Sequence, residues 1–465
     1  YISSYWSSKL ETKMNQQKIC NSFVVIGLGN SGLSAALLLK KRKKQVFCWD
    51  DDCLKRNIAT KKKLTIKQPS KFLFNNVDKL VFSPGINHRD KKFSDLIKNN
   101  EEKIVSDLEL IEIFNLENYR IGITGTNGKS TTTKFIEKSL NYMKINAISC
   151  GNIGTPISEV ISRSNKSDYL VVEASSFQLD KIQKLKFNIS ILLNLSKDHI
   201  EWHGNFSNYK DAKLKIFNNQ NENNYSVISI DDDTCKKISN CFKKSYKSQI
   251  IRISIKRKIS NGIYLKRGKQ KIEIINKISN ENFFVDKKKI RFPLVDHNLQ
   301  NFLATYAISF ILKKSSSQFI SSLKNIESLE HRLELIKKYK NITIYNDSKS
   351  TNIESAKNAI TSFQNIYWIL GGRKKQGGLK GIENSLSNIL HAFCFGESGQ
   401  EFDNFLSNKK IISSFYENLE SCLDNAIKRA LDEKKTVNIV FSPACASFDQ
   451  FKNFEERGKA FKKLT

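Results

Sequence analysis

The feature that most constrains the fold is the stretch GITGTNGKSTTT at residues 122–133. A short apolar run, RIGIT, leads into this glycine-rich turn. The segment after the turn places four apolar side chains on one helical face, namely Phe135, Ile136, Leu140 and Met143. A strand, a glycine turn and a helix in this order aim backbone N–H groups and the positive helix end at a phosphate. Lys129 can then offset charge on a transferring phosphoryl group, and the Ser130 hydroxyl can hold Mg²⁺.

Strand–helix alternation continues on both sides of this loop and predicts an α/β chain of three domains. We expect a Rossmann-like domain over 1–107, in which 1–13 form a disordered extension. A central P-loop mononucleotide-binding ATPase domain with a parallel sheet is expected over 108–328. The last third, 329–465, contains four apolar strands separated by helical stretches and predicts a second Rossmann-like domain.

Residues 245–292 alternate apolar with basic side chains around Asn-Gly and Arg-Gly turn signals. This pattern predicts a small antiparallel appendage to the central sheet, and a nucleic-acid-binding ribbon is the alternative. The net charge of +31 also raises nucleic acid as a partner. The lysines are spread along the whole chain, however, and no aromatic-basic recognition module accompanies them. We therefore expect no nucleic-acid partner, and small anionic substrates such as nucleotides instead.

Cysteine usage and hydropathy bear on the compartment. The nine cysteines contain no C-x-x-C pair, which argues against a disulfide framework and a structural zinc site. No run of about 18 apolar residues occurs, so we expect no membrane-spanning helix. These observations predict a cytoplasmic protein with no membrane partner. We also expect a monomer.

Polar residues follow the two strands that come after the glycine-rich turn. Glu173 and Ser175 follow YLVV, while Asp198 and His199 follow ILLNLS. Ligands of open parallel sheets bind at the carboxyl ends of the strands, so Glu173 and His199 are expected to face the phosphate loop. A carboxylate and an imidazole at this edge can hold a divalent cation that keeps several waters. Taken singly, each side chain also has a purely structural explanation as a turn cap or a helix-start residue.

Two further regions carry possible ligand contacts. Residues 27–32, GLGNSG, have the G-x-G-x-x-G form, and Asp50 ends the next strand. This pattern is typical of a dinucleotide enzyme, although any ligand with a pyrophosphate can use such a loop. In the last third, Arg332 and Lys349 stand at polar strand ends where they can grip carboxylate or phosphate.

Taken together, the motifs of the chain resemble those of the Mur ligase family of amide ligases, within it the branch that adds D-glutamate to UDP-N-acetylmuramoyl-L-alanine. The resemblance runs from about Ser22 to the C-terminus and rests on motifs in the family's order: GTNGKST, EASSFQL, LNLSKDH, YKDAKLKIF, HNLQN, HRLE, NDSKSTN, LGG and SPACASFDQFKNFEERG.

The resemblance implies a reaction in peptidoglycan precursor synthesis, and with it a bacterial cytoplasm as the location. ATP phosphorylates the alanine carboxylate of the UDP-linked substrate, and the amine of D-glutamate attacks the acyl phosphate to give an amide, ADP and phosphate. It also implies two Mg²⁺ sites and a lysine, here Lys213, that carries a carbamate.

The resemblance further implies roles for residues that match the family's motifs. Catalytic roles fall on Lys129, Glu173, His199 and Lys213. The implied metal ligands are Ser130, Glu173, His199 and Lys213 as its carbamate. ATP would be held by Gly125, Thr126, Asn127, Gly128, Lys129, Ser130, Thr131, Asn301, Arg332 and Asp347. The UDP-linked substrate would be held by Asn30, Ser31, Asp50, Asp51, Ser83, Asn152, Ser175 and Gln178. D-Glutamate would be held by Lys349, Thr351, Lys375, Ser447 and Phe454, with Lys374 as the alternative to Lys375.

Rival functions remain open. Other amide ligases of the same family are the nearest alternatives, and among them a folylpolyglutamate synthase would more often read GKGS where this chain has GKST. A diaminopimelate- or lysine-adding member is expected to show a D-N-P-R-like motif, where this chain has NDSKSTN. From other classes, an NAD-dependent oxidoreductase would explain residues 27–50 but would leave the phosphate loop unused. A basic nucleic-acid-binding ATPase is the third alternative.

Overall fold

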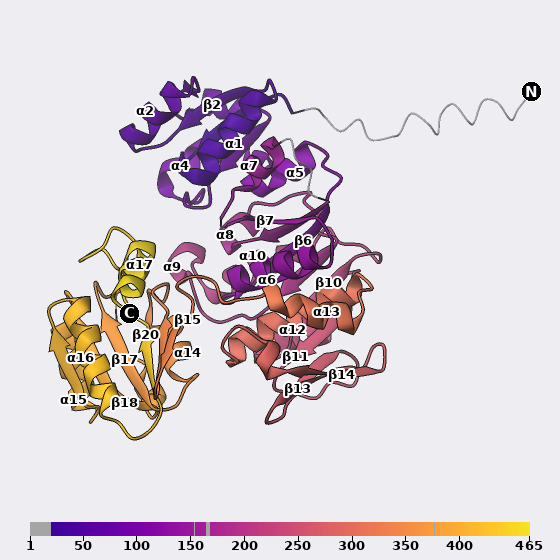
Figure 1. Ribbon diagram of the computed structural model, residues 1–465. Coiled ribbons are helices and arrows are strands. Elements are labelled where there is room, and N and C mark those ends of the chain that lie inside the picture. Colours follow the sequence, from indigo (N-terminus) through magenta and orange to yellow (C-terminus); the bar gives the residue numbers. More distant parts are fainter. Residues whose placement is uncertain (1–19, 153, 164–167, 376) are drawn as a thin grey trace, which may run out of the picture. The chain divides into compact units, whose positions relative to one another are not determined.

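The computed structural model describes residues 20–152, 154–163, 168–375 and 377–465, which form three β-sheets (Figure 1). The predicted extension 1–13 lies outside the described residues. The chain divides into two compact units: one contains Asn146–Ser226 and Cys241–Gln249 with the chain before Asn127, and the other contains Asn127–Ile145, Val227–Asn240 and Ile250–Thr465. Among the described helices, none combines the length and the apolar character that crossing a membrane requires.

The first sheet is parallel and has the strand order β3-β2-β1-β4-β5. Its strands are β1 (Ser22–Ile26), β2 (Gln45–Trp49), β3 (Thr65–Ile66), β4 (Lys79–Phe82) and β5 (Ile104–Val105). The helices of this region are α1 (Asn30–Lys41), α2 (Cys53–Lys61), α3 (Lys71–Asn75) and α4 (Lys91–Ile97). The strand order reverses at β1, as expected for a Rossmann-like domain.

Two glycines let α1 approach the end of β1 closely. Gly27 has a φ of +88°, a left-handed conformation that favours glycine. A Cβ on Gly32 would lie 1.8 Å from the Gly27 carbonyl oxygen, so no larger residue fits at this helix–strand contact. The Ser83 hydroxyl donates to the same carbonyl at 2.6 Å and joins the end of β4 to the loop.

The central sheet has nine strands in the order β14-β13-β12-β11-β10-β9-β6-β8-β7. Its strands are β6 (Tyr119–Thr124), β7 (Ala147–Gly151), β8 (Tyr169–Glu173), β9 (Ile189–Leu192), β10 (Tyr225–Ser229), β11 (Gln249–Ser254), β12 (Ile263–Arg267), β13 (Lys271–Asn276) and β14 (Glu281–Asp286). The pairs of β6 with β8 and β9, and of β7 with β8, are parallel, as predicted around the phosphate loop.

The segment 245–292 differs in part from its prediction. β12, β13 and β14 are antiparallel to one another, as expected. β11 and β12, however, pair in parallel, and both continue the central sheet. The sequence could not show this, because period-2 alternation is the same for either direction. Asn261-Gly262, a typical hairpin signal, here ends a longer return loop between two parallel strands.

The helices of the central region are α5 (Leu110–Ile113), α6 (Lys129–Tyr142), α7 (Ile157–Ser162), α8 (Ser176–Leu179), α9 (Ile200–His203), α10 (Phe206–Leu214), α11 (Asp233–Ser245), α12 (Asp296–Ile311) and α13 (Ser316–Ser322). α12 packs against α6 and is buried along most of its length. Phe302 is fully buried in α12, and its ring is tilted against the rings of Phe292 and Phe319. This apolar packing fixes the start of α12, which carries Asn301.

The third sheet has the order β15-β16-β20-β17-β18-β19. Its strands are β15 (Glu334–Tyr339), β16 (Ile342–Asn346), β17 (Ile366–Gly371), β18 (Ile389–Phe395), β19 (Ser413–Tyr416) and β20 (Val437–Phe441), and its helices are α14 (Ile353–Ile360), α15 (Gly399–Asn408), α16 (Leu419–Leu431) and α17 (Phe454–Leu464). The four predicted strands are present, and β15 adds an antiparallel edge that the sequence did not indicate.

Both faces of the third sheet are buried. Trp368 packs in a cluster with residues of α14 and α15, while the next residue of β17, Ile369, packs in a second cluster with residues of α16 and α17. Successive side chains of a strand point to opposite faces, so helices cover the sheet on both sides. The predicted doubly wound arrangement is therefore confirmed for this part of the chain.

Candidate active site around the phosphate loop

The phosphate loop joins β6 to α6. Gly128 precedes the first helical residue, Lys129, and has a φ of +84°, which only glycine adopts without strain. Thr126 is anchored on the neighbouring strand end, because its N–H donates to the Asn194 carbonyl at 2.9 Å and its hydroxyl accepts from the Ser196 N–H at 3.0 Å. The loop conformation thus depends on the positive φ of Gly128 at one end and on the hydrogen bonds of Thr126 at the other.

Tyr209 is a loop contact that the sequence analysis did not single out. Its hydroxyl lies 3.0 Å from the Thr126 hydroxyl, and the tyrosine is almost fully buried on α10. Burial raises the pKa of the phenol beyond its usual range, so Tyr209 stays neutral. The only sequence signal for Tyr209 was its place in the motif YKDAKLKIF. By itself, a tyrosine at helical spacing is more often a core residue than a site residue.

Glu173 stands at the end of β8 and pairs with Ile123 of β6, which precedes Gly125 of the phosphate loop by two residues. The carboxylate is 2% exposed. One oxygen, Oε1, accepts from the Asn152 amide at 2.9 Å, and Oε2 has no hydrogen-bond partner within the described residues. A buried carboxylate oxygen without a donor is costly, and a cation is the partner that removes this cost. Glu173 therefore fits a metal ligand.

Lys213 lies on α10 and is buried against the phosphate loop. Its Nζ donates to the Gly125 carbonyl at 2.8 Å and lies 3.5 Å from the Thr124 hydroxyl. It also lies 4.8 Å from the centre of the Tyr209 ring, a cation–π distance. Among many lysines, the structure brings this one to the loop, which sequence spacing alone did not show.

His199 begins α9 with a φ of +51°. Its ring lies 4.8 Å from the Phe177 ring, with the Asp198 carboxylate 3.5 Å and the Glu201 carboxylate 3.7 Å from its nitrogens. The side chain is 42% exposed, so solvent and ligands reach it. Within the described residues no cluster of three or more His, Cys, Asp or Glu forms a ready metal site. Any bound Mg²⁺ would then take most of its oxygens from substrate and water, which is usual for this ion.

The EASSFQL segment forms a short capped helix. The Ser175 hydroxyl caps α8 and exchanges hydrogen bonds with Gln178 in a capping box. The other end of the Gln178 amide donates to the buried Asp107 carboxylate at 2.9 Å. Burial raises the pKa of Asp107. Gln178 is fully buried with both amide ends bonded internally, so in this conformation it supports Ser175 instead of presenting a group to solvent.

The nucleotide candidates on the other unit lie on α6, α12 and the loop after α13. The Asn301 amide oxygen accepts from the Thr132 hydroxyl at 3.0 Å, and its Nδ2 is buried without a partner in the described chain. An amide donor left in this way is suited to an acceptor on a nucleobase or ribose. Arg332 Nη2 donates to the Ser130 hydroxyl at 2.9 Å.

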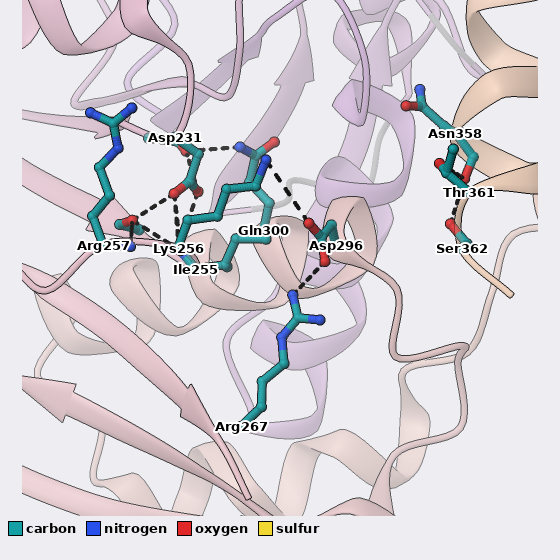
Figure 2. Close-up of polar contacts among 12 residues, drawn as sticks. Asp231, Ile255, Lys256, Arg257, Arg267, Asp296, Gln300, Asn358, Thr361 and Ser362 are labelled. Carbon is teal, nitrogen blue, oxygen red and sulfur yellow. Dashed lines mark hydrogen bonds and ion pairs between the residues drawn. The ribbon is translucent and has the colours of Figure 1, made fainter. Parts of the chain in front are cut away.

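Asp231 is linked to α12 through Ser229 and was missed by the sequence analysis. Asp231 lies two residues after the end of β10, and Figure 2 shows its carboxylate accepting from the backbone N–H groups of Ile255 and Lys256. The Ser229 hydroxyl donates to Asp231 and accepts from Gln300 at 2.8 Å. This network ties the residue before Asn301 to the sheet.

The first-domain candidates gather only in part. Asp50 accepts from the Leu28 N–H at 2.6 Å, so its carboxylate shapes the GLGNSG loop. Ser83 binds the Gly27 carbonyl of the same loop. Asn30 and Ser31 begin α1 beside them. Asp51 instead faces away into an exposed ion pair with Lys92, whose hydrogen bond lowers the pKa of Asp51.

The third-sheet candidates lie at strand ends. Asp347 follows β16 and accepts from the Ser442 hydroxyl at 2.8 Å and the Leu333 N–H at 3.1 Å. Lys349 Nζ lies 3.6 Å from the centre of the Phe454 ring. Of the residues matched to D-glutamate, Lys349, Thr351, Lys375 and Ser447 lie in the loops after β16, β17 and β20, and Phe454 begins α17. Lys374 forms an ion pair with Glu401, while Lys375 is exposed.

Known proteins match this chain over nearly its whole length. Residues 123–309 match the Mur ligase middle domain. The UDP-N-acetylmuramoylalanine–D-glutamate ligase of Rickettsia felis is 35% identical over 449 residues, covering 95% of this chain and 96% of that protein. The proteins of the same name from Wolbachia pipientis wMel and Thermoanaerobacter pseudethanolicus are 34% and 31% identical, each aligned over at least 95% of both chains.

Solved structures show the same fold at lower identity. The MurF ligase of Thermotoga maritima in complex with ADP has a TM-score of 0.59 at 14% identity and covers 97% of this chain and 96% of its own. The UDP-N-acetylmuramate-alanine ligase MurC of Thermotoga maritima has a TM-score of 0.56 at 15% identity, with 95% and 98% covered.

Proposed function

This chain belongs to the Mur ligase family, among the UDP-N-acetylmuramoylalanine–D-glutamate ligases, and from that membership we propose that it joins D-glutamate to UDP-N-acetylmuramoyl-L-alanine using ATP. The observation that carries the proposal is the surroundings of the phosphate loop. Lys213 contacts Gly125 of that loop, and the neighbouring strand presents Glu173 with an oxygen that lacks a donor. An ATP-dependent ligase needs cations and metal ligands at this place, and an NAD-dependent oxidoreductase does not.

The proposed reaction has two steps, phosphorylation of the carboxylate and formation of the amide. A carboxylate oxygen of the UDP-linked substrate attacks the γ-phosphorus of ATP, which releases ADP and gives an acyl phosphate. The D-glutamate amine then attacks the acyl carbon, phosphate leaves and the amine nitrogen loses a proton, which gives the amide. Phosphate makes the carboxyl oxygen a good leaving group, and the main task of the protein is to hold two anions together.

The proposed roles follow from side-chain chemistry. Lys129 would offset charge on the transferring phosphoryl group, Ser130 and Glu173 would be ligands of one Mg²⁺, and His199 would be a ligand of a second. Bound Mg²⁺ supplies Lewis-acid stabilisation of the phosphate oxygens. We further propose that the Lys213 amine reacts with CO₂ to give a carbamate and a proton, which converts a cation into an anionic metal ligand at a second Mg²⁺ site. The buried position of Lys213 beside Gly125 supports this role.

The outer regions hold the substrates in this proposal. Asn30, Ser31, Asp50 and Ser83 lie on or beside the GLGNSG loop, where a UDP pyrophosphate is expected to meet backbone N–H groups. Asn152 is oriented by Glu173. We also propose that the chain works as a monomer in the cytoplasm, which light scattering of the purified protein and fractionation of cells would test.

Phosphate release tests the function directly. Purified protein is incubated with ATP, Mg²⁺ and UDP-N-acetylmuramoyl-L-alanine, and D-glutamate, L-glutamate, diaminopimelate and lysine are added in turn. Release that requires D-glutamate, with a product whose mass has increased by one glutamyl residue, supports the proposal. Equal release with every amino acid, or with none, contradicts it. The matched control is Glu159→Gln, which removes an exposed carboxylate on α7 and should leave release unchanged.

A further inference from the structure

One arginine lies beneath three of the strand-end loops of the third sheet. Arg457, on α17, is fully buried with 0% of its side chain exposed. Burial lowers the pKa of its guanidinium to about 10, so it remains charged at neutral pH. Arginine is rarely buried without a definite set of partners, because taking the charge out of water is costly. The partners of Arg457 therefore indicate its task.

The guanidinium joins the loop after β16 to the loop after β20. Nε donates to the Ser348 hydroxyl at 3.1 Å, and Nη2 donates to the Ser348 carbonyl at 2.8 Å. Nη2 also donates to the Cys445 carbonyl at 3.0 Å. Three hydrogen bonds from two nitrogens of one rigid plane fix the separation of these loops. A lysine carries a single ammonium group without this planar geometry, so it cannot fix the separation of two loops in the same way.

The third nitrogen faces the loop after β17. Nη1 is buried and has no hydrogen-bond partner among the described residues. A Cβ on Gly372 would lie 3.2 Å from Nη1, so the glycine backbone passes directly over the guanidinium. The next residue, Arg373, exchanges two backbone hydrogen bonds with Ala446 of the loop after β20. All three loops thus meet at this one side chain.

The same contacts extend to the residues expected to meet the amino-acid substrate. The Ser348 hydroxyl, which accepts from Arg457, donates to the Phe454 carbonyl at 2.8 Å. Ser348 is followed directly by Lys349, whose Nζ lies 3.6 Å from the centre of the Phe454 ring. Cys445 precedes Ser447 by two residues. Arg457 therefore sets the backbone on which Lys349, Phe454 and Ser447 are carried.

We propose that Arg457 is a positioning residue for the amino-acid substrate, acting through Ser348 and Cys445 without touching that substrate itself. The inference rests on the proposed function, since it takes D-glutamate as the ligand of this loop cluster. The two carboxylates of D-glutamate require cations and hydroxyls held at fixed separations. The Arg457 guanidinium sets these separations by fixing the loops that carry Lys349 and Ser447. The Asp347 carboxylate accepts its hydrogen bonds from Ser442 and Leu333, so we expect ATP binding to depend less on Arg457 than D-glutamate binding does.

The test compares three variants in steady-state phosphate release. Arg457→Met removes every donor but keeps an unbranched chain, Arg457→Lys keeps the charge, and Lys459→Met removes an exposed cation from the same helix as the matched control. We expect Arg457→Met to raise KM for D-glutamate by about tenfold or more, because hydrogen bonds from a charged group are worth more than neutral ones. KM for ATP should stay within about twofold. Arg457→Lys should be intermediate, and Lys459→Met should match the wild type.

The outcomes separate positioning from a merely structural role. Equal rises in KM for ATP and D-glutamate, or an unchanged D-glutamate KM in Arg457→Met, would overturn the proposal. Circular dichroism checks folding. If Arg457→Met does not fold, Ser348→Ala decides, because it removes one acceptor of Arg457 and should raise only the D-glutamate KM, whereas no change refutes the role. If phosphate release by the wild-type protein does not depend on D-glutamate, the proposed function is refuted, and with it the substrate assigned to this cluster.

Discussion

Asp347 offers a prediction in which a buried charge makes stability depend on pH. Burial raises the pKa of this carboxyl from 3.8 to about 7, although hydrogen bonds from Ser442 and Leu333 favour its ionised form. Between about pH 4 and pH 7 the folded protein therefore holds one proton more than the unfolded chain. Stability from this group is complete below about pH 4, falls as the pH rises from about 4 to about 7, and is lost above that.

The size of the effect follows from the shift. About three pKa units correspond to about 4 kcal/mol of differential stability, with a slope of about 1.4 kcal/mol per pH unit inside that window. Asp347→Asn mimics the protonated carboxyl and does not titrate. Its amide oxygen can still accept from the Leu333 N–H, and the Ser442 hydroxyl can rotate to accept from the new NH₂ group. The stability of the variant relative to the wild type should thus rise by about 3 kcal/mol between pH 5 and pH 7.5.

The third sheet contains its own probe for this measurement. Trp368 is fully buried in β17 and donates to the Ser442 carbonyl at 2.8 Å, next to the hydroxyl that binds Asp347. In a background where Trp6, Trp49 and Trp202 are phenylalanine, urea unfolding followed by fluorescence reports on this region. A difference between variant and wild type that stays constant from pH 5 to pH 8, or that shrinks as the pH rises, would refute the reasoning.

Three further changes test the surroundings of the phosphate loop. Glu173→Gln keeps the size of the side chain but weakens the metal ligand, and it should lower kcat/KM by about 100-fold or more and raise the Mg²⁺ concentration for half-maximal rate; an unchanged Mg²⁺ dependence would exclude a metal role. Lys213→Ala should abolish phosphate release, with partial recovery on adding acetate or another short carboxylate, and full activity without addition would contradict the carbamate proposal. Tyr209→Phe removes the hydroxyl next to Thr126 and should cost about 1 kcal/mol of stability, measured by thermal unfolding, with a modest rise in KM for ATP; unchanged values for both would show that this hydrogen bond does not hold the loop.

Much of the central site was predictable because its parts are local. A glycine turn between an apolar strand and an amphipathic segment specifies a phosphate loop whatever surrounds it. Glu173 follows a strand of the same sheet, and parallel strands end at one edge, so its place beside β6 followed from the pattern. The strands β16, β17, β18 and β20 were also evident, because each is a short apolar run closed by polar residues.

Contacts between distant segments were not predictable. The Arg457 hydrogen bonds span more than 100 residues to Ser348, and nothing in local composition separates Arg457 from the other basic side chains of this chain. In the sequence, only the family resemblance singled out Lys213. In the structure, the packing of α10 places its Nζ against the Gly125 carbonyl. The parallel pairing of β11 with β12 likewise depends on a return loop whose path local alternation does not encode.

The sequence by itself indicated most of the apolar strands and the glycine turns, because these depend on short-range periodicity and backbone freedom. The residues assigned to the loop chemistry stay a prediction. Only the tertiary structure decided which polar groups are buried and which of them meet. Burial raises the pKa of Asp347 and leaves one oxygen of Glu173 without a hydrogen-bond partner among the described residues. Packing of α17 places Arg457 in contact with three loops. These properties belong to the packed interior, where the dielectric is low and every unpaired donor or acceptor carries a cost.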